Sequence, residues 1–219
     1  MTDVLLSILI PTVVGREEQL MKLIGSILGY NLPVNEFEND YIDIEHISSS
    51  RGTIQVVYIR DSKVMTIGEK REQLYQKSKG LFSLQIDDDD ELAPNAIKLI
   101  LEVIKSNPEV DCITFEEHID IDGKIERSNH SLAYGDWEGE GGKELWDGFH
   151  YHRTPFMKSV IRTDIARSIP IPHIRFGEDH QWAQALKPHL KTEVHISEQL
   201  YRYIHRSSNP TERYGFDRE

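Results

Sequence analysis

Cysteine is nearly absent from this sequence: its 219 residues include a single one, Cys112, within the apolar run 110–115. A lone cysteine has no partner for an intramolecular disulfide, which fits a reducing compartment and a structural role in a core. A single domain of this length buries about 70% of the surface that its unfolded chain exposes, so it needs no such crosslink. The composition therefore excludes a disulfide-stabilised scaffold.

Long apolar runs and an excess of basic residues are also missing. No stretch approaches the roughly 20 apolar residues of a transmembrane helix. The apolar run 4–14 follows an acidic residue and contains Pro11, which indicates a strand that ends at this proline rather than a targeting segment. With 25 basic and 37 acidic residues, the net charge of −12 disfavours bare nucleic acid and anionic lipid as partners. We expect a soluble cytoplasmic protein with no stable nucleic-acid or membrane binding.

The first half of the chain alternates between strand and helix patterns. Apolar runs predict buried strands at 4–10, 54–59, 81–86 and 110–115. Apolar residues at spacings of three and four predict helices over 20–28, 68–79 and 94–106, whereas 31–52 is polar and irregular. This alternation predicts an α/β fold, with a central, mostly parallel mixed sheet flanked by helices.

The regular alternation of strand and helix patterns ends after residue 116. Asp122-Gly123 is a hairpin turn signal between strand patterns at 117–121 and 124–127. Beyond it the sequence predicts a glycine-rich loop at 135–142, a strand at 158–162, a helix at 177–190 and strands at 192–196 and 200–205. We expect one domain of residues 1–206, with halves 1–116 and 117–206, and a polar tail of residues 207–219.

Five consecutive carboxylates, Asp87 to Glu91, directly follow the predicted strand 81–86. Two such charges ~4 Å apart repel by roughly 4 kcal/mol near a protein surface, so a cation or solvent must neutralise them. A solvated turn that caps the next helix is one interpretation. The other is a ligand site, because α/β folds bind ligands at the carboxyl ends of strands. If the chain stays extended there, Asp87 and Asp89 face one side and can share Mg²⁺ or Mn²⁺ with phosphate oxygens.

An EF-hand is excluded as an explanation of this acidic run. Counted from Asp87, the sixth position is Leu92 and the twelfth is Lys98, where a calcium loop needs glycine and glutamate.

Asp87-x-Asp89-Asp90, with a proline seven residues after the first aspartate, resembles the DxD segment of the family 2 glycosyltransferases, which have the GT-A fold. Other segments resemble motifs of the same family in the same order: 7–12 ending in Pro-Thr, 56–61 ending in aspartate, 67–71 with its arginine, Glu-Asp at 178–179, and Leu-Tyr-x-Tyr at 200–203. The resemblance spans residues 4–206. It departs from the family at Glu72, where asparagine is common, and at 60–63, where an acidic-glycine-serine turn is usual.

This resemblance implies an inverting glycosyltransferase that uses a nucleotide-sugar donor, with a UDP-sugar favoured. The resemblance places the base and ribose pocket at Pro11, Thr12 and Asp61. Contacts with the phosphates and ribose would come from Arg71, Asp87 and Asp88. Asp89 would bind the metal, and Asp179 would be the catalytic base. Mn²⁺ or Mg²⁺ would stabilise the leaving diphosphate, and Asp179 would accept the proton of an acceptor hydroxyl. An ordinary acidic first helical turn is the alternative interpretation of 178–179.

Weaker signals surround these motifs. No histidine has zinc-ligand spacing, but His205 follows the Leu-Tyr-x-Tyr strand and is a candidate ligand of the metal or the diphosphate. The loop 135–142 is either an acceptor-side lid or a plain surface loop. Arg153 and Lys158 would bind an anionic acceptor or be solvated.

Two rival functions stay open. The first is a nucleotidyltransferase of similar topology, although the segment 11–16 has one glycine where that class carries a glycine-rich basic loop. The second is a sugar- or cation-binding module without activity. The acceptor is open as well: a glycan, a lipid-linked glycan, a small molecule or a modified base.

Overall fold

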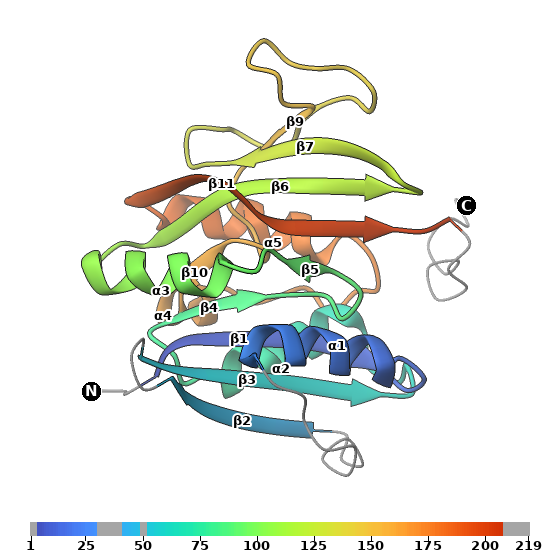
Figure 1. The fold of residues 1–219 in the computed structure, drawn as a ribbon, viewed down its shortest axis with the longest axis vertical. Coiled ribbons are helices and arrows are strands. Elements are labelled where there is room, and N and C mark those ends of the chain that lie inside the picture. The colour runs from blue at the N-terminus through green and yellow to red at the C-terminus, as the bar shows by residue number, and fades with distance from the viewer. Residues whose placement is uncertain (1–3, 30–40, 49–51, 208–219) are drawn as a thin grey trace.

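The computed structural model describes residues 4–29, 41–48 and 52–207 (Figure 1). The strands are β1 (Val4–Val13), β2 (Tyr41–Ser48), β3 (Gly52–Asp61), β4 (Phe82–Gln85), β5 (Glu91–Leu92), β6 (Cys112–Ile121), β7 (Lys124–His130), β8 (Glu138–Gly139), β9 (Tyr151–Arg153), β10 (Val160–Arg162) and β11 (Glu193–His205). The helices are α1 (Glu17–Leu28), α2 (Ile67–Lys77), α3 (Ala96–Ser106), α4 (Thr163–Ser168), α5 (Glu178–Leu186) and a short 3₁₀ turn, η2 (Lys187–His189).

One mixed sheet carries the fold, in the order β2-β3-β1-β4-β10-β6-β7-β9-β8, with β11 paired to β5 and β6. The predicted parallel pairing is found where β1 lies between β3 and β4. In the second half the sheet is mixed: β10 runs antiparallel to β4 and β6, whereas β11 runs parallel to β6. The predicted α/β fold class is confirmed, and its parallel character belongs mainly to the first half.

Helices cover both faces of the sheet, which explains why β1 reads as a continuous apolar run. Ile8 and Ile10 pack in one core cluster with residues of α1 and α3. Leu9 packs in a second cluster with residues of α2, α4 and α5. Figure 1 shows α1 and α3 in front of the sheet and α4 and α5 behind it. Because successive residues of a strand face opposite sides, a strand buried on both faces needs no polar alternation.

β1 does not end at Pro11, as the sequence predicts, but continues to Val13. Its pairing with β4 ends at Leu9↔Gln85, whereas its pairing with β3 continues through Pro11↔Ile59. The carbonyl of Leu9 accepts from the N–H of Ile86, so the β4 side of the strand is where Pro11 would present its missing N–H. That side has no strand partner at Pro11, and the proline therefore costs no ladder hydrogen bond.

Several other boundaries differ from the sequence prediction. The two strands predicted at 110–115 and 117–121 form the single strand β6. The two predicted at 192–196 and 200–205 likewise form one strand, β11, whose register shifts near Gln199. The hairpin turn is confirmed, with φ of 51° at Asp122 and 90° at Gly123. The helix α5 ends at Leu186 instead of 190, because Pro188 falls in the following turn.

The segment 31–52 is not wholly irregular, since 41–48 forms β2 and Gly52 begins β3. Residues 31–40 and 49–51 of that prediction, and 208–219 of the predicted tail, lie outside the described residues. Within the described part of the chain, no helix combines the length and the apolar character needed to cross a membrane.

Candidate functional site

Three adjoining cavities open beside the end of β4. The acidic cavity, of about 230 Å³, is lined by Asp87, Asp88 and Asp89. The basic cavity, of about 540 Å³, is lined by basic side chains that include Lys70 and Arg175. The aromatic cavity, of about 530 Å³, is lined by five aromatic side chains: Trp137, Tyr151, Phe156, Phe176 and Tyr203. Ile67, at the start of α2, borders all three, so the cavities adjoin one another.

The acidic segment after β4 is a turn and not the extended continuation that the sequence analysis assumed. The N–H of Asp90 donates to the carbonyl of Asp87 at 3.0 Å. The side chains consequently diverge: Asp87 faces the aromatic cavity, whereas Asp88 accepts a hydrogen bond from the Thr12 hydroxyl. Asp87 and Asp89 nevertheless both line the acidic cavity, although not through the extended backbone that the sequence analysis assumed.

The protein's own basic side chains neutralise much of this acidic turn. They come from distant segments: Arg71 pairs with Asp87, Arg16 with Asp88 and Asp89, Lys158 with Asp90, and Lys22 and Arg202 with Glu91. Burial still raises the pKa of Asp88 and of Asp90 to about 7, although Arg16 lowers the first and Lys158 the second. The repulsion expected from the sequence is thus relieved from within the fold.

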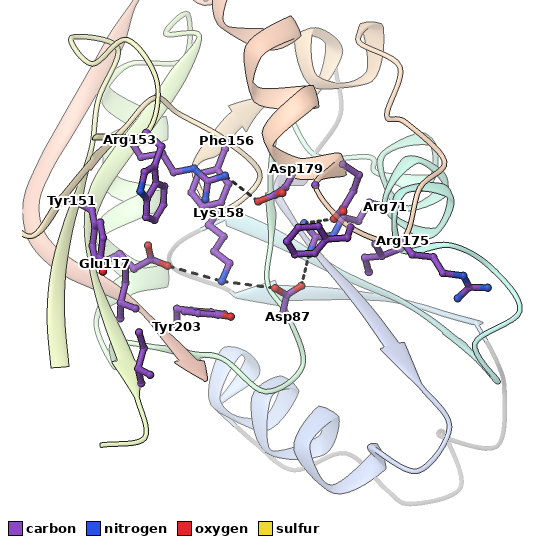
Figure 2. A pocket seen from close by; sticks show the side chains of 17 residues that line it. Arg71, Asp87, Glu117, Tyr151, Arg153, Phe156, Lys158, Arg175, Asp179 and Tyr203 are labelled. Carbon is purple, nitrogen blue, oxygen red and sulfur yellow. Dashed lines mark hydrogen bonds and ion pairs between the residues drawn. The ribbon is translucent and has the colours of Figure 1, made fainter. Parts of the chain in front are cut away.

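Arg71 connects the acidic turn to the Glu-Asp pair at the start of α5. The helix α2 begins with a capping box, in which the Thr66 hydroxyl accepts from the N–H of Glu69 at 3.1 Å. Arg71, one turn further along, donates to Asp87 Oδ1 at 2.8 Å and lies 3.5 Å from Glu178 Oε1 (Figure 2). Burial opposes the charged form of Arg71, but these carboxylates raise its pKa above the ordinary value.

Asp179 faces the aromatic cavity from the first turn of α5. Gly177, with φ of 79°, takes the left-handed conformation that starts the helix here. Arg153 Nη2 donates to Asp179 Oδ2 at 2.9 Å (Figure 2). Burial works to raise the pKa of Asp179, but Arg153 and Arg71 together lower it, so the carboxylate is ionised. The pKa of neighbouring Glu178 is raised, chiefly by burial.

The residues predicted for the base and ribose pocket meet at the carboxyl ends of β1 and β3. Pro11 and Thr12 line the acidic cavity. Asp61 instead shapes the chain before α2: it accepts from the N–H of Met65 at 2.8 Å and from Lys70. Lys70 Nζ also donates to the Thr12 carbonyl at 2.6 Å, so it joins the two strand ends. Asp61 lines none of the three cavities.

Asp87 and Asp89 offer oxygen donors of the kind that Mg²⁺ and Mn²⁺ bind. In the described part of the chain, no three His, Cys, Asp or Glu side chains gather as a metal-binding group. A cation here would therefore take one or two carboxylates and complete its shell with phosphate and water, an arrangement common for Mg²⁺. The donor set fits such an ion. His205, at the end of β11, lines none of the three cavities.

Lys158 and Glu117 are site residues whose roles the sequence analysis did not identify. Lys158 is buried and paired, not solvated: its Nζ lies 2.8 Å from Asp90 Oδ2, 3.8 Å from Asp87 Oδ2 and 3.9 Å from the ring centre of Tyr203. Glu117 lines the aromatic cavity (Figure 2). Its Oε2 lies 3.1 Å from His130 Nε2. Arg153 is likewise paired, with Asp179. In the sequence, Glu117 only begins the predicted strand 117–121, and that position identifies no partner.

The fold is similar to solved structures of TarS from S. aureus. TarS 1–349 in complex with UDP-GlcNAc matches with a TM-score of 0.57 and 15% sequence identity, over 97% of this chain and 61% of that chain. TarS 1–349 in complex with UDP matches with a TM-score of 0.54 and 16% identity, over 91% of this chain and 60% of that chain. The present chain thus spans about 60% of the length of these structures. No protein-family model matches the sequence, and no curated protein matches it. At this level of identity the likeness shows that this chain and TarS share an α/β fold, and no more.

Proposed function

We propose that this chain is an inverting glycosyltransferase of the family 2 type, moving a sugar from a nucleotide-diphosphate sugar to an acceptor hydroxyl. One observation carries the proposal: Asp87 borders both the acidic cavity and the aromatic cavity, and Asp179 lines the latter. A sugar held beside Asp87 therefore has a carboxylate base on one side and a site for its leaving diphosphate on the other. The binding of UDP-GlcNAc and UDP by the structural neighbour TarS supports a UDP-sugar as donor.

The donor nucleotide lies along the acidic and basic cavities in this proposal. Pro11, Thr12 and Asp88 border its base and ribose, and Arg71 and Lys70 provide positive charge beside its phosphates. Mn²⁺ or Mg²⁺ at Asp89 supplies Lewis-acid stabilisation of the leaving diphosphate when bound. Electrostatic stabilisation of charge that develops in the transition state is commonly the largest catalytic effect.

The acceptor occupies the aromatic cavity, and Asp179 takes the proton of its attacking hydroxyl. Oδ2 of Asp179 accepts from Arg153, which holds the carboxylate beside this cavity. A lowered pKa keeps the base ionised at neutral pH. Glu178 is a poorer candidate, because its side chain is only 6% exposed and it faces Arg71.

The test is transfer from UDP-sugars in the presence of Mn²⁺, measured as UDP release with and without acceptor mixtures. Asp179→Asn should lower transfer by about 10²-fold or more, because it removes the general base. UDP affinity, measured by calorimetry, should stay within about twofold, since Asp179 lies on the acceptor side. Comparable turnover in the two proteins would contradict the assignment.

The same assay separates the rival functions. A nucleotidyltransferase would release pyrophosphate and not UDP, and a binding module would release neither while still retaining the sugar nucleotide. Only UDP release that depends on Asp179 agrees with the proposed reaction.

A further inference from the structure

Arg16 holds the position in which a divalent cation would meet the acidic turn. Its Nη1 lies 3.1 Å from Asp88 Oδ1, and its Nη2 donates to Asp89 Oδ2. Arg16 is the one ion-pair partner of Asp89 in the described part of the chain. This atom is one of the two carboxylate oxygens that Asp89 offers to a metal in the proposed donor site. A guanidinium and a divalent ion cannot both occupy this oxygen closely, because like charges repel strongly at such separation.

The surroundings of Arg16 allow its side chain to leave without dismantling the fold. Arg16 precedes α1, and its backbone is anchored independently: its N–H donates to the Val13 carbonyl and its carbonyl accepts from Leu20. The Thr12 hydroxyl continues to hold Asp88 when the guanidinium moves. Arg16 lines both the acidic cavity and the basic cavity, so the guanidinium has space on a second side.

We propose that Arg16 is a built-in counter-cation, which a divalent metal displaces from Asp89 and which then pairs with the diphosphate of the bound nucleotide. The inference rests on the proposed donor site. It has a thermodynamic consequence. Without nucleotide, the metal competes with Arg16 and binds weakly; with UDP present, the displaced guanidinium gains a phosphate partner. Metal and nucleotide binding are therefore positively coupled through one side chain.

The test measures Mn²⁺ binding by calorimetry, and by electron paramagnetic resonance of free Mn²⁺, with and without saturating UDP. Arg16→Met should bind Mn²⁺ about tenfold more tightly than the wild type when UDP is absent. The ratio of Mn²⁺ affinities with and without UDP should fall by about the same factor. A variant that binds Mn²⁺ no more tightly than the wild type overturns the inference.

Lys22→Met is the matched control. Lys22 belongs to α1, pairs with the same acidic turn through Glu91 at 2.7 Å, and its loss changes the net charge equally. If the loss of one positive charge is enough to raise the Mn²⁺ affinity, both variants gain equally, and the specific role of Arg16 is refuted. If Arg16→Met does not fold, the test is a Mg²⁺ titration of the ¹⁵N-labelled wild type, followed by NMR. The Arg16 guanidinium resonance is assigned by its loss in Arg16→Lys. This resonance must shift as Mg²⁺ binds, and an unchanged resonance rejects displacement of the guanidinium.

These outcomes separate this inference from the proposed function. Mn²⁺-enhanced UDP binding that is equal in Arg16→Met and in the wild type rejects the counter-cation and leaves the transferase proposal intact. Tighter Mn²⁺ binding in Arg16→Met, with no sugar transfer from any UDP-sugar, supports the counter-cation and rejects the transferase. Absence of Mn²⁺ binding in every variant rejects both the counter-cation and the proposed metal.

Discussion

Arg153 holds Asp179 in one orientation, which the general base of the proposed reaction needs. Its guanidinium lies 3.5 Å from the ring centre of Phe156 and 5.1 Å from that of Trp137, while it donates to Asp179. Stacking on the two rings restrains a side chain that would otherwise be flexible. The ion pair therefore has two effects on Asp179: it fixes one carboxylate oxygen and lowers the pKa of the group.

Removal of Arg153 should shift the acid limb of the pH profile. The pKa of Asp179 is depressed below its ordinary value of 3.8, so the ionised base persists above the depressed pKa and is lost as pH falls through it. Arg153→Gln removes the principal interaction that depresses this pKa, and burial then raises it. The acid limb of kcat/KM should consequently move to higher pH, which a pH-rate series measures.

Arg127→Gln is the control for that experiment. Arg127 also stacks on a ring, 4.3 Å from the centre of Phe149, and also pairs with a carboxylate, Glu116, at 3.1 Å, but it lines none of the three cavities. Its replacement should leave the pH profile unchanged. Superimposable profiles for Arg153→Gln and the wild type would show that Arg153 does not govern the base.

At the scale of residues, the sequence identified groups but not their partners. Asp87, Asp89 and Asp179 stand out because acidic residues follow a strand or begin a helix, and the structure places all three in adjoining cavities. Their partners are distant in sequence: 73 residues separate Arg16 from Asp89, and 68 separate Lys158 from Asp90. Local pattern carries no information on such pairings, which arise only when the sheet assembles.

At the scale of elements, the sequence pattern predicted the long helices well, and the shortest strands unevenly. The helix predicted over 68–79 lies within two residues of the observed bounds of α2. The strand predicted at 158–162 is confirmed as β10, whereas β9 was not predicted, because its three residues are too few for any periodicity to appear. β11 reads as two strands because its register shifts near Gln199, so that the inward-facing positions change along it.

Gly68, near the start of α2, should tolerate no side chain. A Cβ built there would lie 1.9 Å from the carbonyl oxygen of Pro172, in the segment that leads to α5. Gly68→Ala must therefore push this segment away from α2, separating Arg71 from Glu178. We expect a loss of about 1–3 kcal/mol in the free energy of unfolding, measured by urea denaturation, together with reduced transfer.

Gly135→Ala supplies the comparison for this prediction. A Cβ at Gly135 meets nothing within 4 Å, so this change should alter the free energy of unfolding by less than about 0.5 kcal/mol. Equal stability of the two variants would show that the approach of Pro172 to α2 is not a constraint on the fold.

At the scale of the whole molecule, the α/β fold class could be predicted from the sequence. The order of the strands at the centre of the sheet could not. Alternating strands and helices required a layered α/β domain. The antiparallel strand β10, between β4 and β6, joins the two halves, and it brings Lys158 against the acidic turn. Its three residues gave no signal of that central position. The site thus depends on a junction that composition and periodicity do not encode.

The reactivity of Cys112 can show whether the centre of the sheet is intact, because this residue begins β6, which lies between β10 and β11. It is fully buried, and burial raises its pKa above the ordinary thiol value. Since the thiolate is the reactive form, native protein should react with Ellman's reagent only when the centre of the sheet opens. With a stability of about 5 kcal/mol or more, labelling should be at least about 10³-fold slower than in denaturant.

If UDP and Mn²⁺ bind at the proposed donor site, they should slow this labelling further, because a ligand that binds only the native state stabilises it. Cys112→Ser should give no signal, as Cys112 is the only cysteine. The urea dependence of the labelling rate identifies the opening reaction: a slope equal to the equilibrium value means global unfolding, and a shallow slope means local separation of β6 from its neighbours. We expect the steep dependence, because both core clusters contain residues of β6 and of β10, and neither strand can leave without exposing them.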